Sequence, residues 1–83
     1  MKMYFVVTDD FIGFGYNEYS DIYTKKEDAI NELKNICSKW ESKWESREIS
    51  MYKTVHGNFD RVEYKNRYGI TKMVFKIIER EVR

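Results

Sequence analysis

The chain contains no proline, a single cysteine and a single histidine. The lone cysteine, Cys37, excludes a disulfide within the chain. Together with His56, it supplies fewer ligands than a metal site of ordinary ligand count needs. We therefore expect a fold that depends on its apolar core, with no metal and no other cofactor.

Long apolar runs are also absent, since the longest extend over only a few residues. A transmembrane helix needs about 20 such residues, and the segment after Met1 lacks the apolar stretch and cleavage site of a signal peptide. The net charge of +1 gives no overall field to attract nucleic acid or an anionic membrane. These features predict a cytoplasmic protein without membrane attachment.

Aromatic residues, by contrast, are abundant at 17% of the 83 residues, and 42% of the chain is hydrophobic. This composition argues against disorder, which goes with few aromatic residues. The length is just above the size at which one apolar core can hold a chain without disulfides. We expect residues 1–83 to form a single domain.

The stretch 23–46 is the clearest structural signal, because its apolar residues recur at steps of three and four. That spacing places them on one face of an α-helix, with charged residues on the other. The stripe consists of Ala29, Ile30, Leu33, Ile36, Cys37, Trp40 and Trp44. Thr24 and Glu27 match a capping box, which predicts the start of the helix.

Two strands are predicted before this helix. Residues 2–8 are dense in aromatic and β-branched side chains on both faces, as in a strand that is paired centrally. Asp9 and Asp10 predict a turn, residues 11–16 a returning strand, and residues 17–21 a loop.

Three more strands are predicted after the helix, where the apolar period changes to two. The first covers residues 49–55, the second residues 61–65 with Val62 and Tyr64 inward, and the third residues 70–82. Turns are predicted at residues 56–58 and 66–69. The whole pattern predicts an α+β fold of order β(β)αβββ, with one amphipathic helix across one face of an antiparallel sheet of four to five strands.

Catalytic signals are weak throughout the chain. Cys37 and His56 are formally a nucleophile and base pair, but Cys37 lies on the apolar stripe, where a buried thiol is the ordinary occupant. Neighbouring acids such as Asp9 and Asp10 usually point apart. The short run Gly13–Gly15 is not a phosphate-binding loop, because Glu18 occupies the third glycine position. We therefore expect a protein that is not an enzyme.

One segment resembles an RNA-binding signature. Gly13, Phe14, Gly15, Tyr16 and Tyr19 match much of the aromatic RNP1 pattern of RNA-recognition motifs. The likeness covers about 20 residues. It departs from that family at Ile12, where a basic residue is usual, and in the insertion at residues 20–24. Only about eleven or twelve residues precede the match, whereas the family has a complete β-α-β unit there. The resemblance implies an RNA- or single-strand-binding module in which Phe14, Tyr16 and Tyr19 stack on bases.

Charge segregation supports a different partner. Residues 3–24 contain no lysine or arginine but four acidic residues, and they are rich in aromatic side chains. Acids beside aromatic anchors suit a basic, groove-like protein surface, because charge steers the encounter and the anchors supply binding energy. The predicted partner-binding residues are Asp9, Asp10, Phe14, Tyr16, Glu18, Tyr19 and Asp21, with Trp40 and Trp44 as either core residues or a partner or dimer face.

The favoured hypothesis is a small binding protein that contacts another protein. Lysine outnumbers arginine, and Ile, Tyr and Asn are plentiful, a usage typical of low-GC bacteria and their phages and mobile elements. We therefore expect a phage or mobile-element inhibitor that occludes a host nucleic-acid-processing or defence protein. The alternatives are the RNA-binding module above and a dimeric structural protein built through the helix face.

Overall fold

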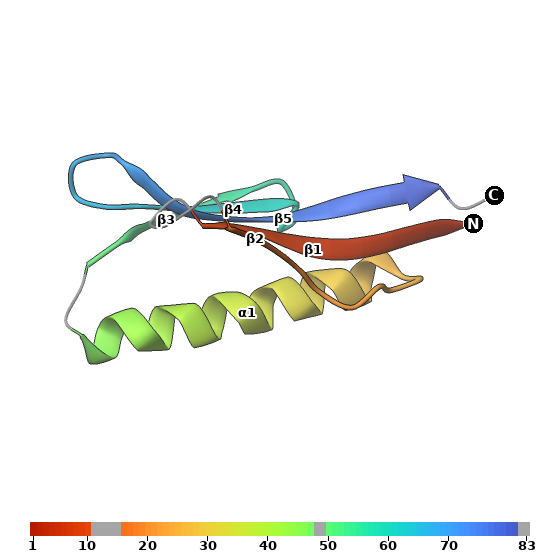
Figure 1. The fold of residues 1–83 in the computed structure, drawn as a ribbon, viewed down its shortest axis with the longest axis horizontal. Coiled ribbons are helices and arrows are strands. Elements are labelled where there is room, and N and C mark those ends of the chain that lie inside the picture. The colour runs from red at the N-terminus through yellow and green to blue at the C-terminus, as the bar shows by residue number, and fades with distance from the viewer. Residues whose placement is uncertain (11–15, 48–49, 82–83) are drawn as a thin grey trace.

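The computed structural model describes residues 1–10, 16–47 and 50–81, and these form two layers (Figure 1). One layer is an antiparallel sheet and the other is the helix α1, which runs along one face of it. The strands are β1 (Lys2–Asp10), β2 (Tyr16–Tyr19), β3 (Tyr52–His56), β4 (Arg61–Lys65) and β5 (Thr71–Glu81), and α1 is Lys26–Ser46. The predicted α+β class and element order are confirmed.

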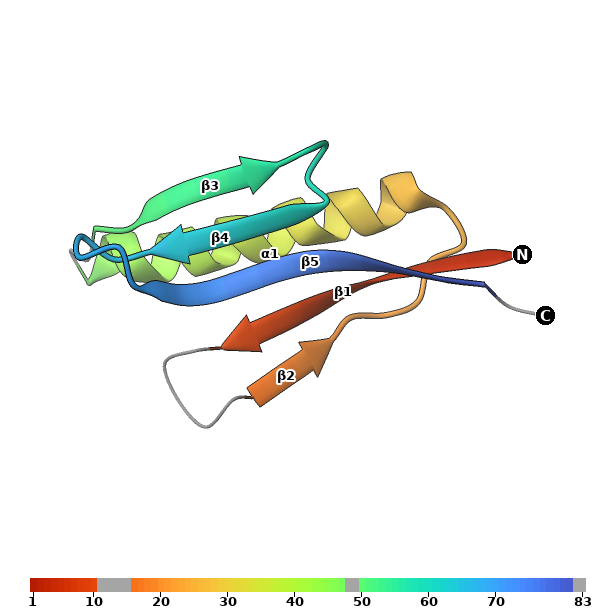
Figure 2. The ribbon, with the colours of Figure 1, turned by 90° about the horizontal axis from the view of Figure 1, so that it is seen from above.

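In the described part of the chain the sheet has five strands in the order β2-β1-β5-β4-β3 (Figure 2). The two longest strands, β1 and β5, pair at its centre from Lys2 and Glu81 to Asp10 and Met73. Both are dense in β-branched and aromatic residues, which pack well on a pleated surface. β2 and β3 are left at the two edges of the sheet.

The core lies between α1 and the sheet. The helix buries Ala29, Ile30, Leu33, Cys37 and Trp44, which belong to the predicted stripe. Ile36 and Trp40, also predicted there, are partly buried against the same core. The sheet contributes Val6, Val62, Tyr64, Met73 and Phe75. Alternation along each strand brings these residues to the helix side.

The predicted capping box is wrong. The N-cap of α1 is Lys25, and no side chain among the described residues makes a capping hydrogen bond there. Thr24 lies one residue too early, because Tyr23 forms an isolated bridge with Tyr4 through two backbone hydrogen bonds of 2.8 Å. This bridge fixes the extended backbone that enters the helix, so α1 begins one residue later than the pattern indicates. Its end at Ser46 agrees with the prediction.

The first hairpin also differs from the prediction. Asp9 and Asp10 are not a turn but the end of β1, where they pair with Asn17 and Tyr16. The returning strand is Tyr16–Tyr19, so three of the residues predicted as loop belong to it. Residues 11–15, where most of the returning strand was predicted, lie outside the described residues. Local composition failed here because polar residues can pair at the end of a strand when the partner strand continues.

The strands after the helix follow the prediction more closely. Val62 and Tyr64 point inward and are 0% and 1% exposed, and residues 71–81 form a strand rather than a second helix. The predicted turns are present, with Gly57 and Gly69 at φ 59° and 78°, in the left-handed region that favours glycine. β3 begins at Tyr52, later than predicted, and Ile49 lies outside the described residues.

The sheet is apolar on its second face as well. Val7 and Val74 alternate with Val6 and Phe75, so they lie on the face away from α1, yet they are only 6% and 2% exposed. Both belong to the central strands, which have a neighbour on each side. This agrees with the prediction that residues 2–8 form a strand paired centrally.

Candidate binding groove

The edge strand β3 presents unpaired backbone groups to solvent. Asp60, the residue before β4, directs its carbonyl toward β5, where it accepts a hydrogen bond of 2.9 Å from the Ile77 N–H. Main-chain groups of an antiparallel ladder alternate in direction, so Arg61 and alternate residues of β4 turn toward β3. It follows that the N–H and C=O groups of Lys53 and Val55 point outward. No strand in the described part of the chain pairs with that edge.

All five residues of β3 are exposed. Tyr52 and Val55 keep 65% and 40% of their surface accessible, although aromatic and β-branched residues are typical of paired strands. Proteins usually protect such an edge by a short strand, a charged side chain, proline, a bulge or a covering segment, and of these devices β3 has the charge of Lys53. The register of β3 with β4 is regular along its whole length, and the chain contains no proline. β3 is therefore a strand suited to pairing on its open side.

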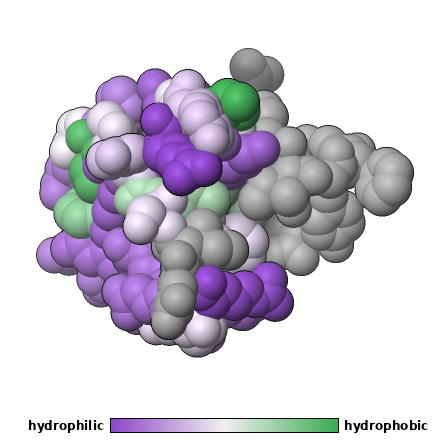
Figure 3. All heavy atoms as spheres, turned by 90° about the vertical axis from the view of Figure 1, so that its left-hand side faces the viewer, coloured by the Kyte–Doolittle hydropathy of each residue, from purple (hydrophilic) through white to green (hydrophobic). Residues whose placement is uncertain are grey.

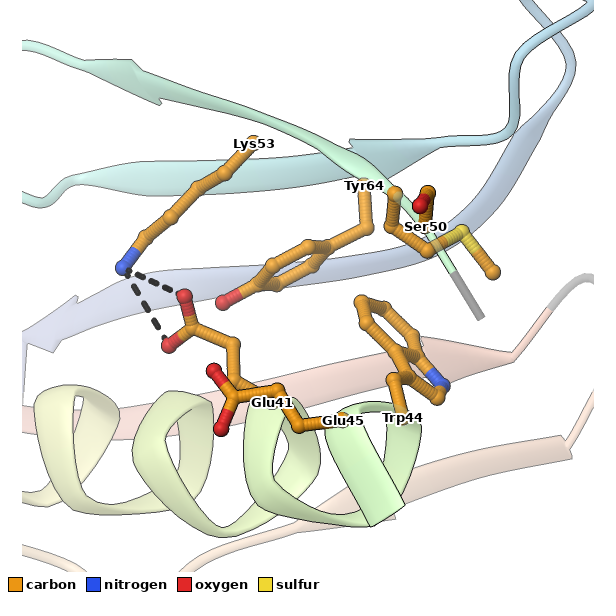
Figure 4. A pocket seen from close by; sticks show the side chains of 7 residues that line it. Glu41, Trp44, Glu45, Ser50, Lys53 and Tyr64 are labelled. Carbon is orange, nitrogen blue, oxygen red and sulfur yellow. Dashed lines mark hydrogen bonds and ion pairs between the residues drawn. The ribbon is translucent and has the colours of Figure 1, made fainter. Parts of the chain in front are cut away.

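A pocket of about 240 Å³ opens beside the start of β3 (Figure 4). It lies between this strand and the last turns of α1. Its lining residues are Glu41, Trp44, Glu45, Ser50, Met51, Lys53 and Tyr64. We use the name β3–α1 groove for the open edge of Tyr52–His56 together with this pocket.

Two carboxylates and one ammonium group face the pocket. Lys53 Nζ lies 3.4 Å from both carboxylate oxygens of Glu41, a long contact between side chains that are about a third exposed (Figure 4). Glu45 is exposed and makes no ion pair with any described residue. The charged groups lining the pocket therefore carry one net negative charge, located at Glu45.

The Tyr64 hydroxyl is the polar group deepest in this site. Tyr64 is 1% exposed, and its oxygen makes no hydrogen bond of good geometry within the described residues, although the Cys37 thiol and the Glu41 carboxylate are near enough to interact with it. The ring extends from β4 so that the hydroxyl points toward the Glu41 and Lys53 pair (Figure 4). Burial, and then the nearby Cys37 and Glu41, raise the pKa of Tyr64 well above its usual range. The hydroxyl therefore stays neutral in ordinary buffers, able both to donate and to accept a hydrogen bond.

The apolar wall of the pocket is held by an aromatic chain. Trp44 meets Tyr64 edge-to-face with ring centroids 4.8 Å apart, and it meets Trp40 in the same way at 5.1 Å. Tyr64 in turn contacts Phe75 at 5.9 Å. Each such pair contributes about 0.5–1.5 kcal/mol beyond simple burial. The pocket is therefore built on the core rather than on loops.

Other large side chains are exposed around this end of the molecule. Tyr68 and Ile70, in the turn between β4 and β5, are 70% and 54% exposed, and Tyr52 pairs with Lys65 immediately before that turn. Figure 3 shows this end, where small hydrophobic areas lie among hydrophilic side chains. Of these features, exposed tyrosine is the one that is enriched at protein interfaces.

The predicted acidic residues do not form one compact site in the described structure. Asp9 lies 3.5 Å from Lys76, so its charge is partly neutralised. Asp10 ends β1, whereas Asp21 follows Ser20, whose backbone bonds to Val6. By register Asp21 lies about level with Phe5, so at about 3.3 Å per residue it is roughly 17 Å from Asp10 along the hairpin, while Glu18 is opposite Thr8. Tyr16, Glu18 and Tyr19 belong to β2, while Phe14 lies outside the described residues.

Trp40 and Trp44 have different surroundings. Trp44 is 7% exposed and belongs to the core, although one side of it lines the pocket. Trp40 is partly buried against that core, and its indole nitrogen is buried without a hydrogen-bond partner among the described residues. The Lys43 ammonium lies over its ring, 5.8 Å from the centroid. Only Trp44 joins the groove that the geometry identifies.

Cys37 and His56 are on opposite faces of the sheet. Cys37 is 1% exposed in the core under α1, and burial raises the pKa of its thiol. His56 Nε2 lies 3.7 Å from Glu63 Oε2. Both residues lie on the face away from α1, because each follows an inward-facing valine along its strand, Val55 in β3 and Val62 in β4. The two side chains that could form a nucleophile and base pair are thus separated by the sheet.

The groove was missed at the level of sequence, although one signal was present. Glu41 and Glu45 are four residues apart in the repeat KWESKWES, so they share a helix face beside the tryptophans. Nothing in the sequence showed that Lys53 and Tyr64 would lie opposite them. That juxtaposition depends on the order of strands in the sheet.

No protein-family model matches the chain, and neither a curated protein nor a solved structure does. In the described residues, no helix combines the length and apolar character that crossing a bilayer requires. Functional inference therefore depends on the geometry of the groove.

Proposed function

We propose that this protein acts by binding another protein, and that an extended segment of the partner adds to the sheet along β3. The observation that carries this proposal is the open, regular edge of Tyr52–His56 beside a pocket. In binding by strand addition, main-chain hydrogen bonds provide affinity, and pockets for alternate side chains provide specificity. The β3–α1 groove supplies both parts from neighbouring elements.

The finer proposal is that binding inhibits the partner. A small phage or mobile-element protein that covers a segment of a host nucleic-acid-processing or defence protein would block its function without chemistry of its own. The amino-acid usage of the chain supports such an origin. The Trp44 and Tyr64 wall would favour tight binding of the covered segment, because a rigid pocket loses little conformational freedom on binding.

Two variants at one position test strand addition. Val55→Pro removes an N–H that points outward, and it leaves the hydrogen bonds between β3 and β4 in place. Val55→Ala removes similar side-chain contacts but keeps the N–H, so it is the matched control. Circular dichroism first checks that both variants are folded. They are then used to capture partners from a candidate host lysate with and without nuclease.

We expect a protein that is retained by wild type and Val55→Ala and lost with Val55→Pro, whether or not nuclease is present. Capture that disappears with nuclease would instead support the RNA-binding alternative. A wild-type protein that sediments as a dimer, and Val55→Pro as a monomer, would show that the edge pairs with a second copy. Equal capture by both variants would contradict binding at β3.

A further inference from the structure

We propose that the pocket beside β3 accepts a lysine or arginine side chain of the added segment. This inference rests on the proposed function, and it specifies which sequences the groove selects. Its starting point is the net negative charge of the pocket, where Glu41 and Glu45 face one ammonium, that of Lys53. The C-terminal end of α1, which adds a partial negative charge of about half a unit, lies at the same place.

The position of Lys53 determines where the basic residue must stand. Lys53 pairs with Tyr64, so both side chains are on the helix side of the sheet. Residues directly opposite each other in an antiparallel pair share a face. A partner residue opposite Lys53 would therefore place its side chain on the helix side, next to the pocket, where Glu41 and Glu45 would offset the like charge of Lys53. The next residue of the partner would point to the other face.

The buried hydroxyl of Tyr64 supplies a second, independent reason. A buried polar atom without a partner is costly, and few such atoms remain in native proteins. Tyr64 lines the pocket and its neutral hydroxyl points toward the Glu41 and Lys53 pair, so a guanidinium or ammonium N–H that enters between them can donate a hydrogen bond to it (Figure 4). A cationic donor would thus satisfy both the free carboxylate of Glu45 and the Tyr64 oxygen.

The apolar part of the pocket suits the long stem of such a side chain. Trp44 and Met51 line it, and methylene groups of lysine and arginine pack well on apolar surface while the charge reaches polar groups. An indole is also the preferred aromatic partner of a cation. The competing ammonium of Lys53 does not fill the pocket, because it is held only by long contacts to Glu41 and is 34% exposed.

A displayed library of random peptides tests this preference without knowledge of the natural partner. Peptides are selected on the wild-type protein and then measured against Glu45→Gln, Tyr64→Phe and the charge-matched control Glu27→Gln, which lies at the other end of α1. We expect lysine or arginine at one fixed position. Removing the Glu45 charge should weaken these peptides about tenfold, since hydrogen bonds to charged groups are strong. Glu27→Gln should leave their affinity unchanged.

A second arm separates the pocket from the strand. In the best peptide the basic residue is replaced by norleucine, which keeps the apolar stem and removes the charge. We expect weaker binding to wild type, and equal binding of this peptide to wild type, Glu45→Gln and Tyr64→Phe. Peptides that require the Val55 N–H but show no basic preference would overturn the pocket assignment and leave strand addition standing. Failure to select any peptide that is sensitive to Val55→Pro would overturn both.

Discussion

At the scale of single residues, Tyr64 has two roles, one in core packing and one in the proposed binding pocket. Its ring is part of the core, between Trp44 and Phe75, and its hydroxyl points toward the Glu41 and Lys53 pair beside the pocket (Figure 4). A residue chosen only for packing would be phenylalanine, which fills nearly the same space without a buried polar atom. The hydroxyl is therefore the group for which a role in binding can be separated from a role in folding.

We expect Tyr64→Phe to leave stability unchanged or to raise it by about 1 kcal/mol, because it removes a buried polar group that has no hydrogen-bond partner in the described structure. Urea denaturation provides the measurement. Tyr52→Phe, on the exposed edge, is the control and should be neutral. A loss of more than about 1 kcal/mol would mean that the hydroxyl has a protein partner.

The core residue Leu33 and its neighbour Lys34 provide a second comparison. Leu33 is 0% exposed in the middle of α1, whereas Lys34 is exposed. Leu33→Ala should lower the free energy of unfolding by about 2–5 kcal/mol, because it leaves a cavity. Lys34→Ala should cost little, since only the contact of the ammonium with the Phe59 ring at 4.7 Å is lost. Equal shifts in denaturant midpoint would contradict the assigned helix face.

At the scale of elements, α1 begins without a side-chain cap. Its N-cap is Lys25, and lysine cannot accept the hydrogen bonds that the first backbone N–H groups offer. Lys25→Ser should therefore stabilise the protein by about 0.5–2 kcal/mol, the usual value of a cap. Thermal denaturation tests this. Lys39→Ser, within the helix, should be slightly destabilising, and stabilisation by both variants would exclude capping as the cause.

The elements also show how far the sequence could lead. The helix face and the strands 61–65 and 71–81 were predictable, because each has a periodic apolar pattern that burial enforces. The first hairpin was not, since Asp9 and Asp10 pair by main-chain bonds that require no apolar side chain. Sequence indicated Trp44 as part of a site but not Lys53 beside it, because their contact follows from the placement of β3 at the edge.

At the scale of the whole molecule, one ion pair joins the helix to the turn before β4, and another lies along β4 itself. Lys26 of α1 lies 2.8 Å from Asp60, and its hydrogen bond and charge lower the pKa of that carboxyl. For Glu63, burial alone would raise the pKa, but the hydrogen bond and charge of Arg61 outweigh it and lower the pKa. Both carboxyls are thus more acidic in the folded protein than in the unfolded chain.

These pKa shifts predict loss of stability in acid. A carboxyl whose pKa is lowered by folding stabilises the protein above its unfolded-state value, here 3.8 for Asp60 and 4.5 for Glu63. That contribution disappears as pH falls through the lower folded-state values. Melting temperatures measured in a series of buffers from pH 6 downward through the unfolded-state values give the measurement. The double variant Asp60→Asn, Glu63→Gln should show a smaller drop than wild type, and an equal drop would assign the acid sensitivity to other groups.

The central position of β5 has a consequence for how the protein forms during synthesis. β5 follows every other described element in the chain, yet it alone joins the β1–β2 hairpin to the β3–β4 hairpin. Until it leaves the ribosome, these are two separate pairs of strands, and isolated hairpins are marginally stable at best. Pairing of β1 with β5 also brings together residues from nearly opposite ends of the chain, and contacts between residues far apart in sequence form slowly. Emergence of residues 71–81 is therefore the step at which the nascent chain becomes able to fold.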